Sequence, residues 1–178
     1  MDYYSFFAQR NIPCEKGLDD NELNDIERLY NIVFPVEYRA MLKEVVPVAE
    51  GFCDWRNMSD ASIENIRERI YSPIKELLEN TCDIYWNEEW GIEKVGEDRD
   101  CFLQEKLENA PKLIPVYAHR YMPMVKGKSV PVISIYGCDV IYYGSNINEY
   151  FEIEFGHRKQ QDIEFANIRH IDFWTDIM

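Results

Sequence analysis

Residues 132–143 read Val-Ile-Ser-Ile-Tyr-Gly-Cys-Asp-Val-Ile-Tyr-Tyr, two short apolar runs on either side of a Gly-Cys pair. Branched and aromatic residues favour strands, and glycine in the first central position fits a two-residue type II′ turn. We therefore predict a β-hairpin over this stretch. A further short strand is predicted over 113–117, where Pro115 would confine it to a sheet edge or a bulge.

Helix signals dominate the first half of the chain. Asp19 and Glu22 form an acidic capping box that predicts the start of one helix. Pro35 suits the first turn of a second helix, and Ser59 can cap a third. The Pro73 ring predicts that this third helix breaks and restarts. Smaller elements are predicted as a short helix over 4–10, a strand over 82–87, a helix over 102–110 and a helix opened by an Asn146–Glu149 capping box.

Helices therefore come first and strands cluster later, without regular βαβ alternation. This order predicts an α+β fold, with helices packed on a mixed or mostly antiparallel sheet. The length of 178 residues fits one domain, and no Gly/Ser-rich linker divides it. We expect a single domain over residues 1–178, in which residues 1–18 form an N-terminal extension.

The chain is strongly acidic, with 33 Asp and Glu against 19 Lys and Arg and a net charge of −14. Nucleic-acid binding needs clustered cations, so we expect no nucleic-acid partner. An acidic face could instead attract a basic protein. The alternative is that the charge only keeps copies of the protein apart and soluble.

Five scattered cysteines without a C-x-x-C pair fit reduced thiols better than a disulfide framework. We also find no pattern typical of a signal peptide and no run of about 20 apolar residues. The expectation is a cytoplasmic protein with no membrane partner.

Enzyme signatures are missing from the sequence. There is no phosphate-binding glycine loop, no nucleophile elbow and no H-E-x-x-H zinc motif, and the three histidines never pair at helical spacing. We expect no enzyme activity, and we predict no catalytic residue, metal or cofactor.

Three groups of residues stand out as candidate binding residues. Asp54, Trp55 and Arg56 combine an acid with two side chains that often anchor interfaces; the alternative is that Trp55 fills the core while Arg56 pairs with Asp54 or a backbone carbonyl. The polar triplet His119, Arg120 and Tyr121 lies between two prolines and could face a pocket or pin its own loop. Trp86 and Trp90 flank two acids and could form a platform for a sugar or belong to the core.

Several stretches resemble the SUKH superfamily, also described as the Smi/Knr-like domain. The opening resembles the family's acidic helix, apolar-Pro step and aromatic-basic helix, and the stretch 110–117 together with 119–123 is the most specific likeness. Two family elements are replaced here, an Asn-Gly-Gly step by 46–51 and an Arg-Pro pair by Ile92-Glu93-Lys94. The matching stretches, spread over residues 19–178, are 27–30, 33–39 with Leu42, 54–57, 72–74, Trp86 with Trp90-Gly91, 110–117, 119–123, 131–134, 139–144 and 173–174.

The resemblance implies a non-catalytic cytoplasmic α+β domain that binds other proteins. Bacterial members are immunity proteins that occlude a secreted toxin, often a nuclease, so a basic toxin domain is the implied partner. Fungal members regulate cell-wall and glucan synthesis, which leaves a regulatory or scaffolding role open. An unrecognised enzyme or a small-ligand sensor, with Trp55, His119 and Arg120 around a pocket, is a further alternative from the residues themselves.

Overall fold

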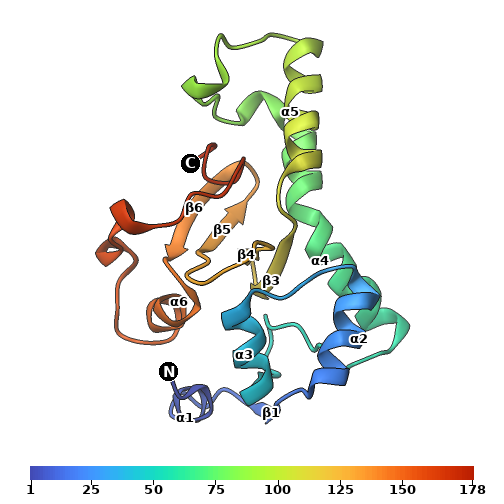
Figure 1. The fold of residues 1–178 in the computed structure, drawn as a ribbon, viewed down its shortest axis with the longest axis vertical. Coiled ribbons are helices and arrows are strands. Elements are labelled where there is room, and N and C mark those ends of the chain that lie inside the picture. Colours follow the sequence, from blue (N-terminus) through green and yellow to red (C-terminus); the bar gives the residue numbers. More distant parts are fainter.

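The computed structural model describes residues 1–178 and has the α+β architecture predicted from the sequence (Figure 1). Two antiparallel sheets are present, one of two strands and one of four. No helix of the chain is both long and apolar enough to cross a membrane.

The N-terminal part pairs helices with the small sheet. The Asp19 carboxylate accepts hydrogen bonds from the backbone of Asn21 and Glu22, and the Glu22 carboxylate accepts one from the Asp19 N–H, which confirms the predicted capping box. The small sheet was missed because its strands have only three residues each. The elements are α1 (Tyr3–Ala8), β1 (Cys14–Lys16), α2 (Asp20–Tyr30), α3 (Val36–Glu44) and β2 (Val45–Pro47).

The middle of the chain forms a long helical arm. It contains α4 (Asp60–Glu79), two short 3₁₀ turns (Thr81–Asp83 and Glu88–Trp90) and α5 (Glu97–Asn109). The predicted break at Pro73 is wrong, because α4 continues through it. Proline removes one backbone hydrogen bond from a helix, but Pro73 is buried on the same face as Ile66 and Leu77, and this burial opposes the loss.

The strand predicted over 82–87 is also wrong. A 3₁₀ turn and irregular backbone occupy this stretch, which belongs to the segment between α4 and α5 (residues 80–96, the connector). Two carbonyl oxygens here accept hydrogen bonds from a side chain and not from a neighbouring strand. The Arg99 guanidinium donates to the oxygens of Thr81 and Ile84.

The four-stranded sheet has the order β3-β4-β5-β6, with every neighbouring pair antiparallel. The predicted hairpin is confirmed, and Gly137 has the positive φ (+58°) that a type II′ turn needs in its first central position. Pro115 lies on an edge strand, at a register shift, as predicted. The strands are β3 (Leu113–Tyr117), β4 (Arg120–Pro123), β5 (Val132–Tyr136) and β6 (Asp139–Gly144).

The large sheet has a hydrophobic cluster on each face, because successive strand residues point to opposite sides. Ile114 and Met122 face a cluster of 25 buried residues shared with α1, α2, α3 and α6 (Ile147–Glu154). Leu113 and Tyr121 face a cluster of 13, shared with the end of α4, with α5 and with the C-terminal tail.

Residues 1–18, expected as an N-terminal extension, pack into the larger cluster. Phe7 is fully buried, and its ring meets Phe151 of α6 edge-on, with centroids 5.1 Å apart. The tail after α6 contains two 3₁₀ turns, Gln160–Asp162 and Phe165–Asn167.

Candidate protein-binding surface

The arm formed by α4, the connector and α5 (residues 60–109, the acidic arm) contains most of the excess negative charge. It has 14 acidic and 6 basic residues, a net of −8 out of −14. All of these acids except Glu76 are exposed. In Figure 1 the arm runs along one side of the molecule and extends beyond the large sheet.

Few of these acids are neutralised within the arm. Its ion pairs are Arg67–Glu64 and Lys75–Glu79, both at 3.9 Å, and Arg99–Glu93 at 3.1 Å. The other 11 acids have no ion-pair partner, so the arm presents a negative field to solvent.

Residues 91–98 (the tip) add apolar side chains to this charge. Ile92 is 94% exposed and Val95 is 81% exposed, with Glu93, Glu97 and Asp98 beside them. Gly91 and Gly96 bracket the two aliphatic residues, with φ values of +85° and +57° that favour glycine. Removing exposed branched side chains of this kind from water lowers the free energy, so a partner that covers them would be bound more tightly.

An aromatic group supports the tip from below. Trp86 meets Trp90 edge-on, with ring centroids 5.5 Å apart, and both contact Phe102 of α5. The Trp86 Nε1 group donates to the carbonyl oxygen of Gly91 at 2.9 Å. The tip therefore starts from a fixed base, which lowers the entropy lost when a partner binds.

Arg99 fixes the other side of the connector. Its guanidinium is nearly buried and donates to the carbonyl oxygens of Thr81 and Ile84, the latter at 2.6 Å, and to the Glu93 carboxylate at 3.1 Å. These bonds tie the first turn of α5 to both ends of the connector.

The predicted candidates Trp86 and Trp90 thus lie directly beneath the tip, half-buried. Sequence reasoning missed Ile92, Val95 and Arg99. The available signal was the Gly91–Gly96 bracket around an apolar pair in an acidic run, the same place where the sequence departs from the SUKH pattern.

Asp54, Trp55 and Arg56 separate in the structure. Trp55 is 1% exposed, and its Nε1 group donates to the buried Tyr38 hydroxyl at 3.3 Å, so it fills the core. Arg56 pairs with Glu15 and Glu22 at 2.8 and 2.9 Å and also donates to the carbonyl oxygens of Lys16 and Gly17. Asp54 is exposed and does not pair with Arg56, but Arg56 does bind backbone carbonyls, so the alternative of a core Trp55 and a carbonyl-bound Arg56 is confirmed.

The triplet at 119–121 is divided between two elements: His119 lies in the short turn between β3 and β4, and Arg120 and Tyr121 begin β4. Arg120 is buried, donates to the Ser134 hydroxyl at 2.9 Å and lies 3.4 Å from the Glu154 carboxylate. Burial raises the pKa of Glu154, and Arg120 opposes that shift. The Tyr121 side chain is also buried.

His119 is exposed, and its ring packs edge-on against Tyr136, with centroids 5.9 Å apart. Desolvation lowers its pKa, and the nearby Arg120 charge adds to the effect. His119, Arg120 and Trp55 therefore have separate surroundings, and none of them lines any of the five main cavities.

No group of three or more His, Cys, Asp or Glu side chains could hold a metal ion. Burial raises the pKa of the Cys53 thiol to about 12, the opposite of what a nucleophile needs.

The comparisons with family models, curated proteins and solved structures find no match to this chain.

Proposed function

We propose that this chain is a non-catalytic protein-binding domain of the immunity type, which neutralises a basic toxin domain by covering its surface. The observation that carries the proposal is the tip, where two exposed aliphatic side chains lie beside Glu97 and Asp98, which form no ion pair, on a fixed base. The sequence likeness to SUKH immunity proteins supports the same role.

The tip resembles a small protein interface, with apolar side chains at its centre and charged side chains around them. Affinity in protein complexes concentrates in a few buried apolar anchors, which polar residues surround and shield from water. Ile92 and Val95 are the anchors here, while the acids of the arm steer an oppositely charged partner into contact.

A nuclease is the toxin class that best fits this surface. An enzyme that grips a phosphate backbone needs a cleft lined with Lys and Arg. The acidic arm presents carboxylates to the same cations, so the arm and the nucleic acid would compete for the cleft. Occlusion by charge and shape requires no bond-breaking chemistry from this chain.

The test measures binding and inhibition with purified basic nuclease domains, beginning with any toxin whose gene neighbours that of this chain. We expect tight binding, and we expect excess protein to stop nucleic-acid cleavage. Affinity should fall as salt rises, because counterions screen the contact. If no such domain is bound or inhibited, the proposal fails.

A matched pair of variants locates the surface. Glu88→Lys with Glu89→Lys reverses two exposed acids of the arm, and Glu50→Lys with Glu164→Lys makes the same change outside it. We expect the arm variant to lose about tenfold or more in association rate, while the control loses much less. Equal losses would mean that only the net charge matters.

A further inference from the structure

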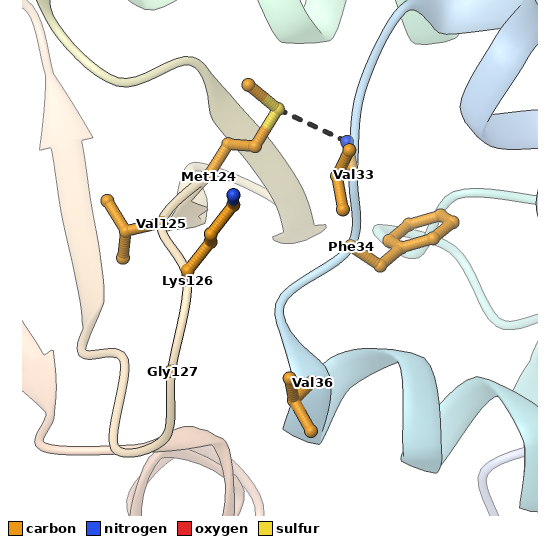
Figure 2. Close-up of a pocket in the computed structure, with 7 residues that line it drawn as sticks. All are labelled: Val33, Phe34, Val36, Met124, Val125, Lys126 and Gly127. Carbon is orange, nitrogen blue, oxygen red and sulfur yellow. Dashed lines mark hydrogen bonds between the residues drawn. The ribbon is translucent and has the colours of Figure 1, made fainter.

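A small apolar groove opens between the segment that precedes α3 and the loop that follows β4. Figure 2 shows Val33 and Val36 on one wall and Met124 and Lys126 on the other. Its volume is about 220 Å³. This is below the roughly 300–1,000 Å³ of small-molecule sites, and it suits one or two side chains of a protein segment.

The walls of the groove are unusually open for branched aliphatic residues. Val33 is 62% exposed and Val36 is 54% exposed. The Val33 N–H donates only to the Met124 Sδ atom, at 3.2 Å (Figure 2). A thioether is a weak acceptor, so a peptide carbonyl could replace it. Methionine side chains also adapt easily to a new neighbour.

The charge around the groove is opposite to that of the arm. Residues 109–138 contain no acid, although the chain as a whole has 33. Lys126 and Lys128 are exposed and form no ion pair. Two acids lie at the margin. Glu27 accepts from the Phe34 N–H and is paired with Arg39 at 3.7 Å, whereas Glu37 accepts from the Ser129 N–H and keeps its charge beside the two lysines.

We propose that this groove binds the tip of a second copy of the chain. Ile92 and Val95 provide the aliphatic side chains that the groove can bury, and the tip acids meet Lys126 at its rim. In Figure 1 the connector lies at the far end of the molecule from the junction of α3 with the large sheet. The tip of one copy therefore reaches the groove of another copy and not its own.

This contact joins two different surfaces, so it repeats head to tail and forms open chains or rings. It is small compared with the roughly 1,200–2,000 Å² of stable interfaces, and copies of net charge −14 repel at a distance. The association is consequently weak and concentration-dependent. This self-association occupies the tip, so a basic partner that binds the tip would dissociate the copies. The self-association also needs the groove, which the proposed function does not use.

Sedimentation velocity of the full chain, from low micromolar to millimolar concentration, tests the proposal. The average mass of the wild type should rise with concentration. Ile92→Asp removes the tip and Val33→Asp removes the groove, and each variant alone should stay monomeric. An equimolar mixture keeps one intact tip and one intact groove, so it should form pairs and nothing larger.

Tyr4→Asp is the matched control, since it makes the same kind of change at an exposed residue of α1 and should associate like the wild type. Circular dichroism shows whether each variant is folded. A wild type that is monomeric at millimolar concentration overturns the proposal. So does association that survives in both variants, or a mixture of folded variants that stays monomeric. Val33→Asp should still bind a basic partner, which separates this proposal from the proposed function.

Discussion

The indole ring of Trp90 stacks on the ring of Phe173, with centroids 6.1 Å apart and planes 6° from parallel. This contact joins the connector to the C-terminal tail, 83 residues later in the chain. The Asn87 side chain strengthens the link by donating to the carbonyl oxygen of Asp176 at 3.1 Å. The exposed tip is thus held by residues that the sequence places far apart.

Trp90→Ala should loosen the tip. Trp90 is half-buried, so we expect a loss of about 1.5–3 kcal/mol in the free energy of unfolding, below the value for a fully buried aromatic residue. Urea denaturation measures this loss. Hydrogen exchange should speed up over residues 85–98 more than in the sheet. Unchanged exchange in that segment would show that the stacking does not hold the tip.

Arg99→Met should be more damaging, because it leaves the carbonyl oxygens of Thr81 and Ile84 without their donor. Unsatisfied buried polar groups cost about 1–3 kcal/mol each, and we expect a loss in that range or somewhat above it. Arg67→Met, which removes an exposed guanidinium from α4, should change the free energy of unfolding by under about 0.5 kcal/mol. Similar losses in both variants would contradict this role for Arg99.

Glu154 gives a pH prediction. Its pKa in the folded protein is raised above the ordinary 4.5 by burial, so the folded state holds the proton more tightly than the unfolded state. The Glu154 contribution to stability is therefore present below pH 4.5 and falls as the pH rises through the raised pKa.

Glu154→Gln removes this titration. The stability of the variant relative to the wild type should be higher at pH 7 than at pH 4, as measured by urea unfolding at both values. A relative stability that instead falls between pH 4 and pH 7 would mean that the pair with Arg120 outweighs burial.

Trp55 and the tip should respond in opposite ways. Trp55→Ala empties a buried site, so we expect a loss of about 3–5 kcal/mol in stability. Ile92→Ser changes a side chain that is already in solvent and should shift stability by under about 0.5 kcal/mol. Thermal unfolding of the two variants distinguishes a core residue from a surface anchor. If Trp55→Ala changes stability only slightly, Trp55 is not a core residue and would again be a candidate for binding.

The sequence predicts best where structure is local. The Asp19–Glu22 capping box and the hairpin turn at Gly137 depend on neighbours within a few residues, and both are confirmed. The continuous α4 and the missing strand at 82–87 depend instead on tertiary contacts. Pro73 is accepted because it is buried, and the connector is irregular because a distant guanidinium binds its carbonyls.

The candidate surface follows the same division. Large residues such as Trp86 and Trp90 attract attention in a sequence, and they proved to support the tip. Ile92 and Val95 look like ordinary core residues until the structure shows their exposure. Trp55 shows the reverse case, because the sequence suggests a binding anchor and the structure places its side chain in the core.

The most direct test compares the affinity of the wild type and of the double variant Ile92→Ser/Val95→Ser for a basic nuclease toxin domain, by surface plasmon resonance. Tyr4→Ser is the control. The double variant should stay folded and bind at least about tenfold more weakly, mainly through faster dissociation, while the control binds like the wild type. Equal affinity of the folded double variant and the wild type would contradict the central claim that the tip is the binding anchor.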